Sequence, residues 1–343
     1  MEKILTIVIP TYNMQDYLRR CLDSLIVPEK QIKQLEVLVV NDGSKDNSSA
    51  IAHEYQDKYP GTFRVIDKEN GNYGSCVNRG LKEATGKYIK ILDADDWFDK
   101  TLFQDYLKQL CLQDVDIILN DCYKVNKFGR NCGAFEILGM QENKVYTLKF
   151  LYENNIFPQM HCIAYRTELL RDIDYHQTEG ISYTDQEWVS KPMSNTTSIV
   201  YFRLAIYNYM VGREGQTMDR KILNTKFSDH VTMIFSILDY MISCTYKNKV
   251  NLAYLQDKMF NLLYYLYKIH IVDGIFANSD FNLFDSSFQK KYPNFYALFN
   301  NKRLIRLWHK QNRCFCYKMV LKIYSFIQQL KSKVTTQHPY GHE

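Results

Sequence analysis

The chain has 343 residues, and its 43 Lys and Arg against 38 Asp and Glu give a formal charge of +5. Hydrophobic residues make up 46% and charged residues 24%, a globular composition that excludes a wholly disordered chain. This length is typical of two domains, or of one large domain with an extension. So small an excess of positive charge does not indicate a nucleic-acid partner.

Cysteine spacing and apolar runs bear on the cellular compartment. The nine cysteines are scattered and form no C-x-x-C pair, which is typical of free thiols in a reducing cytoplasm. The N-terminal apolar run stops at Pro10, too early for a signal peptide. No run reaches the roughly 18 apolar residues that a membrane-spanning helix needs. We therefore expect a cytoplasmic protein that is neither secreted nor membrane-spanning.

The first 120 residues alternate between strand and helix patterns. Helical spacing of apolar residues occurs over 17–25, 47–59 and 74–84. Short β-branched or apolar runs predict five strands, at Ile4–Ile9, Leu35–Val40, Phe63–Ile66, Tyr88–Leu92 and Val115–Leu119. Strands that alternate with helices predict βαβ units, and hence an α/β fold with a mostly parallel sheet flanked by helices.

The rest of the chain is less regular and then becomes helical. Strands are predicted at Cys162–Tyr165 and Ser198–Met210, with a short helix over Asp185–Lys191 between them. Beyond residue 221, helical spacing predicts helices at 221–243, 251–272 and 301–330. We therefore expect an α/β domain over residues 1–220 and a helical C-terminal region over 221–343.

Polar residues follow four of the predicted strands. They are Asn13, Asp42, Asn70 and the pair Asp93 and Asp95. Because ligands of such sheets bind beyond the carboxyl ends of the strands, these residues are expected to converge on one edge.

Asp93-Ala94-Asp95 is a D-x-D sequence at a strand end, followed directly by Asp96. In an extended segment Asp93 and Asp95 point the same way, and their oxygens suit Mg²⁺ or Mn²⁺. The alternative is a solvated turn before a helix that starts near Asp99. The βαβ context favours the metal site. Neither a G-x-G-x-x-G sequence after a strand nor a P-loop is present, so a dinucleotide or P-loop site is not indicated.

These motifs, in this order, resemble a family 2 glycosyltransferase with the GT-A fold. The resemblance is strong over residues 1–120 and weaker to about 215. It is carried by Ile7–Asn13, Val39–Asp46, Glu69–Asn72, Asn78–Gly80 and Ile91–Asp96.

The resemblance implies a nucleotide-sugar site. Tyr12 would stack on the nucleobase, Asp42 would accept a hydrogen bond from it, typically from uracil, and Asp95 would hold Mn²⁺ or Mg²⁺. Val77 stands where the family often has Arg, so Arg79 is the expected substitute. The nucleotide-binding set implied is Pro10, Thr11, Tyr12, Asn13, Asp42, Asn70, Asn78, Arg79, Asp93 and Ala94. For Asn78 the alternative is plain helix packing on the sheet.

The resemblance also places the catalytic base, at Asp185. The segment Tyr183–Trp188 is similar to the family's E-D-x-x motif, in which this carboxylate deprotonates the acceptor hydroxyl. A helix cap is the alternative, and Glu187 is the second choice of base. A single positioned carboxylate favours direct displacement with inversion at the anomeric carbon. The expected diphosphate or acceptor contacts are His161, Glu187, Trp188 and Arg213. The alternatives are a structural histidine for His161 and an ordinary turn for Arg213.

The positive charge lies in the tail. Residues 301–343 hold nine Lys or Arg and one Glu, giving +8, which leaves −3 for the first 300 residues. The segment 301–334 reads as a basic amphipathic helix, which can lie on an anionic membrane surface. Packing on the preceding helices is the alternative. Membrane contact would place the protein on the inner face of the plasma membrane.

The function expected is an inverting, metal-dependent transfer of a sugar, from a UDP-sugar to a saccharide or lipid-linked saccharide, in surface polysaccharide synthesis. A catalytically silent scaffold that binds sugar nucleotides is the alternative from another class. A nucleotidyltransferase is disfavoured, because no Gly-rich loop with Lys or Arg follows the first strand.

Overall fold

A computed structural model describes residues 2–126, 128–212, 224–302, 305–306 and 309. The chain forms two compact units, one of Met1–Thr217 with Ser228–Gln256 and one of Met218–Phe227 with Asp257–Glu343. Each unit is described by itself. The expected division into 1–220 and 221–343 stays a prediction.

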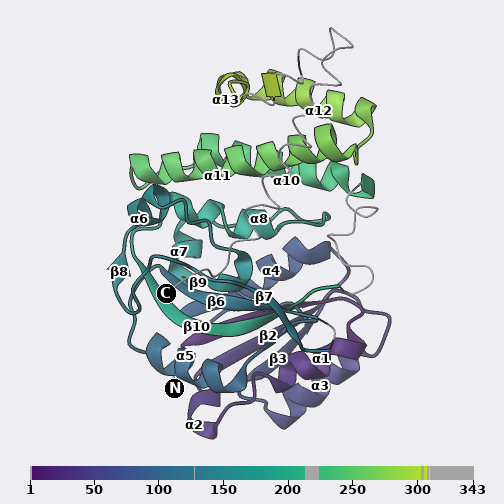
Figure 1. Ribbon diagram of the computed structural model, residues 1–343. Coiled ribbons are helices and arrows are strands. Elements are labelled where there is room, and N and C mark those ends of the chain that lie inside the picture. The colour runs from purple at the N-terminus through teal and green to yellow at the C-terminus, as the bar shows by residue number, and fades with distance from the viewer. Residues whose placement is uncertain (1, 127, 213–223, 303–304, 307–308, 310–343) are drawn as a thin grey trace, which may run out of the picture. The chain divides into compact units, whose positions relative to one another are not determined.

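The larger unit is built on one ten-stranded sheet (Figure 1). The strand order is β3-β2-β1-β4-β9-β6-β10-β5, with β7 paired to β6 and β8 to β10. Strands β3, β2, β1 and β4 run parallel, as do β6 and β10, whereas β9 is antiparallel to β4 and β6. The mostly parallel α/β fold is therefore confirmed. The strands are β1 Leu5–Thr11, β2 Leu35–Asn41, β3 Phe63–Asp67, β4 Tyr88–Ile91, β5 Trp97–Phe98, β6 Ile117–Val125, β7 Asn131–Phe135, β8 Val145–Tyr146, β9 Ile163–Arg166 and β10 Ile199–Met210.

Helices cover both faces of this sheet. In Figure 1, α1, α3 and α5 lie on one side of it and α4, α7 and α8 on the other. Helix α4 packs so tightly on the sheet that a Cβ at Gly80 would meet Val8 Cγ1 at 2.4 Å. The helices of this unit are α1 Gln15–Asp23, α2 Glu29–Ile32, α3 Ser48–Lys58, α4 Asn72–Glu83, α5 Lys100–Leu110, α6 Leu148–Glu153, α7 Thr167–Asp172, α8 Asp185–Trp188 and α10 Phe227–Ser243, with 3₁₀ turns at Met160–Cys162 and Lys191–Ser194.

The observed elements follow the predicted ones closely in the first half of the chain. The five strands expected before residue 120 are all present, and the run predicted at Leu35–Val40 is buried along its whole length. Helix α8 begins at Asp185 as predicted but ends at Trp188, and a 3₁₀ turn follows. Asp99 caps α5 by accepting hydrogen bonds from the backbone of Thr101 and Leu102. The Asp93–Asp96 cluster is therefore not the cap of that helix.

The smaller unit contains the C-terminal part of α11 Lys249–Lys268, a π turn at Ile269–Asp273, α12 Asn278–Lys291 and α13 Pro293–Phe299. Aromatic rings form its core, with Phe281, Phe284 and Phe288 of α12 buried. Helices α12 and α13 were not predicted. The expected helix 301–330 lies mostly outside the described residues. None of the described helices is long and apolar enough to span a bilayer.

Candidate functional site

The loops that follow β1, β2 and β3 contact one another at the carboxyl edge of the sheet. Asn13 Oδ1 accepts a hydrogen bond from Lys45 N at 2.8 Å, and Asn70 Nδ2 donates to Asp42 O at 3.0 Å. The backbone of Asp42 donates to Thr11 O at 2.8 Å. The convergence predicted for Asn13, Asp42 and Asn70 is therefore confirmed.

These loops line an open cavity of about 570 Å³. Tyr12 lies at this cavity with 45% of its surface exposed, so its ring is accessible to a flat ligand. Thr11 is instead buried: its hydroxyl donates to Ile9 O at 3.1 Å and its carbonyl accepts from Asp42 N at 2.8 Å, so it does not line the cavity. The lining residues are Tyr12, Asn41, Gly43, Lys45, Asp67, Lys68, Glu69 and Asn70.

Asp42 is a buried carboxylate that is held by a lysine. Its Oδ1 accepts from Lys68 Nζ at 2.5 Å and from Gly71 N at 2.9 Å. Lys68 also donates to Glu69 O at 2.6 Å and to Ser75 Oγ at 2.9 Å. Opposite charge and backbone donors compensate the burial of this carboxylate. Sequence reasoning did not identify Lys68, although it directly precedes the Glu69–Asn72 motif.

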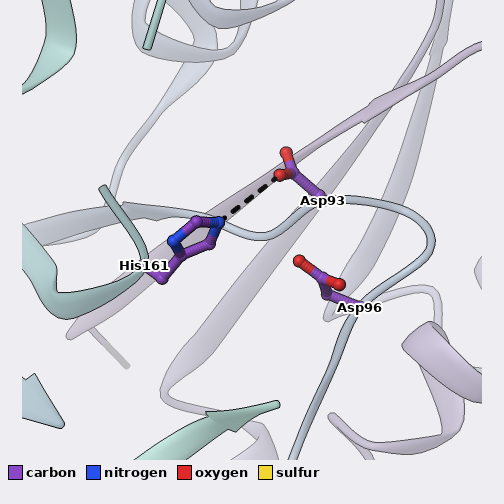
Figure 2. A group of neighbouring side chains, drawn as sticks. All are labelled: Asp93, Asp96 and His161. Carbon is purple, nitrogen blue, oxygen red and sulfur yellow. Dashed lines mark ion pairs between the residues drawn. The ribbon is translucent and has the colours of Figure 1, made fainter. Parts of the chain in front are cut away.

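The D-x-D segment follows β4. Tyr73 Oη donates to Asp93 Oδ1 at 2.7 Å, and the backbone of Asp93 donates to Tyr207 Oη at 3.1 Å. Figure 2 shows the His161 ring directed at Asp93, with Nε2 to Oδ2 at 4.0 Å, and Asp96 beside them. One potential ligand atom from each of Asp93, Asp96 and His161 lies within 4.8 Å of the others.

Asp96 has a structural role within this group. It is 1% exposed, and its two oxygens accept from Tyr207 Oη at 2.8 Å and from Met210 N at 2.7 Å. Burial, with the nearby charges of Asp93 and Asp95, raises the pKa of Asp96 well above its ordinary value. Both oxygens hold β10 against this loop. Asp96 is therefore a poorer metal ligand here than the partly exposed Asp93 and Asp95.

His161 is neutral at physiological pH. Burial, with the charge of Lys90, lowers its pKa to about 3. Its ring packs against Tyr207 and Tyr209, with centroids 4.9 and 4.3 Å away. Its buried Nδ1 has no hydrogen-bond partner among the described residues. A neutral imidazole within 4.8 Å of the partly exposed Asp93 carboxylate is a donor set that fits a divalent cation.

Lys90, in the middle of β4, supports this site from inside the core. It is fully buried, and burial lowers its pKa to about 8. Its Nζ donates to Asn120 Oδ1 at 3.0 Å, His161 O at 2.8 Å and Ile163 O at 3.1 Å. These bonds fix the turn that carries His161. In the sequence Lys90 is a single lysine within an apolar strand, and this pattern does not indicate that it supports the site.

Asp185 stands at the first position of α8, directly after a loop that is hydrogen-bonded to α4, the helix that carries Tyr73. Burial raises the pKa of Tyr73 well above its ordinary value, and the charges of Asp93 and Asp185 both contribute. The same two charges raise the pKa of Tyr209, after burial and Asp96. The charges of Asp93 and of Asp185 therefore act on the same two tyrosine side chains. Gln186 Nε2 donates to Asp185 Oδ2 at 2.9 Å.

Glu187 and Trp188 point into the core behind Asp185. Both are fully buried, and Trp188 packs edge-on against Tyr165 and Tyr175. Glu187 pairs with Lys191 at 2.7 Å. The structure therefore gives no support to acceptor or diphosphate contacts by these two side chains.

The remaining expected residues are placed as follows. The side-chain amide of Asn78 makes hydrogen bonds to the loop that precedes Asp185. Arg79 is 44% exposed and pairs with Glu83 on its own helix at 3.0 Å. Ala94 is buried between the two aspartates of the D-x-D segment. Arg213 lies outside the described residues.

Comparisons with known proteins agree with this architecture. Residues 6–174 match the profile of the family described as Glycosyl transferase family 2. An uncharacterized glycosyltransferase of Mycoplasma genitalium is 30% identical over 212 residues, covering 57% of this chain and 70% of that protein. Glycosyltransferase GlyA of Streptococcus pneumoniae is 33% identical over 151 residues, 44% of this chain. That match spans 21% of GlyA, so the chain corresponds to about a fifth of its length.

Solved structures show the same fold. The first 349 residues of Staphylococcus aureus TarS in complex with UDP align over 99% of this chain and 94% of theirs, with a TM-score of 0.57 and 20% identity. The same TarS fragment without a named ligand gives a TM-score of 0.61 at 18% identity. At this identity the likeness establishes the fold alone.

Proposed function

The chain belongs to glycosyltransferase family 2, and we propose that it transfers a sugar from a uridine-diphosphate sugar to a hydroxyl of a saccharide or lipid-linked saccharide. The observation that carries this proposal is that helix α4 contacts both parts of the proposed site: Tyr73 Oη donates to Asp93 Oδ1 at 2.7 Å, and Asn78 Nδ2 donates at 2.9 Å to Gln177 O, in the loop that precedes Asp185. This contact supports a site in which a donor-binding carboxylate and a proton acceptor act together. TarS, whose name is poly(ribitol-phosphate) β-N-acetylglucosaminyltransferase, favours an acceptor in surface polysaccharide synthesis.

The cavity beside Tyr12 is the proposed nucleobase site. Tyr12 stacks on the base and Asn70 lines the same cavity, while Pro10, Thr11 and Asn13 support Tyr12 as its neighbours in the chain. Asp42 accepts a hydrogen bond from the base. Because an ionised carboxylate is only an acceptor, it favours uracil, whose N3 carries a proton, over cytosine, whose N3 does not.

The diphosphate is proposed to bind over the D-x-D segment, with Asp95 and Asp93 as ligands of Mn²⁺ or Mg²⁺. A bound divalent cation there would neutralise charge on the leaving diphosphate. Asp93 is held in place by the hydroxyl of Tyr73. Neutral His161 can donate or accept a hydrogen bond at the same place. Arg79 remains a proposed nucleotide contact, and Arg213 a proposed diphosphate or acceptor contact.

Asp185 is the proposed general base. Its carboxylate accepts the proton of the acceptor hydroxyl, and that oxygen attacks the anomeric carbon from the face opposite the diphosphate. The bond between the anomeric carbon and the diphosphate oxygen breaks, so the anomeric configuration inverts. A positioned base of this kind contributes on the order of 10²–10⁴ to the rate.

A panel of nucleotide sugars tests the proposal. UDP-sugars, GDP-sugars and CDP-sugars are each added with Mn²⁺, and binding is read as a rise in melting temperature and turnover as release of nucleoside diphosphate. We expect a UDP-sugar to give both effects and EDTA to abolish turnover. Binding without turnover of any donor, in water or with saccharide acceptors, would support a silent scaffold instead. Absence of any binding would contradict the proposal.

Location at a membrane is a separate proposal. The basic segment 301–334 is proposed to hold the protein on the inner face of the plasma membrane, near a lipid-linked acceptor. Flotation with anionic vesicles, compared between the full chain and one ending at residue 300, tests it. Equal flotation of the two proteins would contradict the membrane contact.

A further inference from the structure

The loop that delivers Asp185 has no regular structure of its own. Residues 173–184 join α7 to α8, and the stretch 176–184 forms no helix or strand. Tyr183 has φ +67°, a left-handed conformation that costs free energy in a residue with a side chain. A loop of this kind keeps one conformation only if neighbouring elements hold it. The position of Asp185 therefore depends on contacts made outside α8.

Asn78 of helix α4 holds the start of this loop. Its Nδ2 donates to Gln177 O at 2.9 Å and to Glu179 Oε1 at 2.8 Å, and its Oδ1 accepts from Gln177 N at 2.8 Å. Nδ2 also lies 3.2 Å from His176 Nε2. An amide group has two donor hydrogens and one acceptor oxygen. The loop thus occupies both the donor group and the acceptor of Asn78.

Gly74, one turn earlier on α4, lets the loop approach closely. A Cβ on Gly74 would stand 2.2 Å from Thr178 O and 3.0 Å from Thr178 C. Both neighbours are backbone atoms, so they cannot move aside without moving the loop. The backbone of Gly180 also donates to Gly71 O at 2.9 Å, just before the start of α4.

The opposite side of the same loop is bound to α8. Thr178 N donates to Glu187 Oε2 at 2.8 Å, and Thr178 Oγ1 donates to Glu187 Oε1 at 3.0 Å. Glu187 lies two residues after Asp185 on α8. Thr178 therefore packs against Gly74 of α4 and is hydrogen-bonded to Glu187 of α8. Contacts thus run continuously from one helix to the other.

We propose that Gly74 and Asn78 are positioning residues that lock loop 176–184 and thereby set the place of Asp185. This inference rests on the proposed role of Asp185 as the base. Helix α4 also carries Tyr73, whose hydroxyl orients Asp93. One rigid helix thus sets both the donor-side carboxylate and the base. Asn78 acts through the loop and not as a nucleotide contact.

Two variants perturb the lock in different ways. Asn78→Ala removes its hydrogen bonds, and Gly74→Ala adds a methyl group against the loop backbone. The matched controls are Lys82→Ala, an exposed residue of α4, and Gly61→Ala, where a Cβ would meet nothing within 4 Å. Each protein is compared for UDP affinity, for kcat of UDP release from the donor found by the panel, and for hydrogen exchange of the backbone amides over 176–184.

We expect both lock variants to lose about 10- to 100-fold in kcat, because small displacements of a reacting group have effects of this size. Their UDP Kd should stay within about twofold of the wild type, and the amides of Gln177 and Gly180 should exchange faster. Both controls should match the wild type in all three measurements. A conservative rescue is available as well. The single variant Asn78→Asp places a second carboxylate beside that of Glu179. Because the double variant Asn78→Asp/Glu179→Gln removes one of these two charges, it should recover part of the lost kcat.

The opposite pattern would overturn the inference. If Asn78→Ala weakened UDP binding tenfold or more with kcat unchanged, Asn78 would be a nucleotide contact. Unchanged exchange over 176–184 in both lock variants would also refute the lock, and that measurement does not depend on activity. A wild-type protein without UDP binding or turnover would instead refute the proposed function, which keeps the two failures distinguishable.

Discussion

The buried ion pair behind Asp185 gives a quantitative test of the structure. Glu187 and Lys191 are four residues apart, with 2.7 Å between Oε1 and Nζ, and their side chains are 0% and 8% exposed. Glu187→Gln keeps the size of the side chain but removes its charge. The ammonium of Lys191 would then be left with neutral partners, His176 O at 2.8 Å and Ser236 Oγ at 3.2 Å.

The expected cost follows from that burial. Breaking a buried pair by neutralising one partner leaves an uncompensated charge and costs about 3–5 kcal/mol. Glu187 also accepts hydrogen bonds from Ser236 Oγ at 2.5 Å and from Thr178. A Gln amide cannot satisfy all of these donors. We therefore expect Glu187→Gln to fall in the upper part of this range.

The chain contains a matched control. Glu29 and Lys33 have the same spacing, the same order and the same 2.7 Å distance, but their side chains are 83% and 57% exposed. An exposed pair of this kind contributes little to stability. Urea unfolding, followed by tryptophan fluorescence, compares Glu187→Gln, Glu29→Gln and the wild type. Equal, small losses for the two variants would refute the claim that the Glu187 pair is buried and supports α8.

Two further predictions concern the sheet. Gly80→Ala should lower the free energy of unfolding by about 1–3 kcal/mol through overpacking against Val8, and the better helix propensity of Ala offsets ~1 kcal/mol of this loss. In a Val8→Ala background the same change should be neutral or stabilising. An equal loss of stability in both backgrounds would contradict the contact between Gly80 and Val8. Burial raises the pKa of Asp116, but hydrogen bonds from Thr197 and other partners outweigh it and leave that pKa below its ordinary 3.8. The ionised form therefore stabilises the fold above pH 3.8, and in urea unfolding at pH 7 Asp116→Asn should lower the free energy of unfolding by about 2–3 kcal/mol. This difference from the wild type should narrow as the pH falls below 3.8, and a difference that widened there would contradict the prediction.

The sequence predicted those parts of the fold that depend on local pattern. The run Leu35–Val40 is continuously apolar and is followed by Asn41-Asp42-Gly43, so both the buried strand and the polar residues at its end could be recognised. The D-x-D segment was placed correctly at the end of β4 for the same reason. In a parallel sheet the carboxyl ends of the strands lie along one edge, so the loops that follow them share that edge.

Features that depend on distant partners could not be predicted. Lys90 is satisfied by Asn120 and by carbonyls near residue 161, so nothing near it in sequence marks its role. Glu187 has Lys191 four residues later, but its further contact with Ser236 of α10 is not visible in the sequence. The two-residue strands β5 and β8 exist only through pairing with β10. Helix α12 has apolar residues at 281, 284 and 288, a helical spacing, but its many Asn, Asp and Ser residues are typical of loops.

The most direct test of the central claim is the effect of Asp185→Asn on donor binding and on transfer. Asn keeps the size and polarity of the side chain but cannot accept the acceptor's proton. We predict that the UDP Kd stays within about twofold of the wild type while the transfer rate falls by about 10²–10⁴. Retention of most of the transfer rate would contradict the assignment of Asp185 as the base.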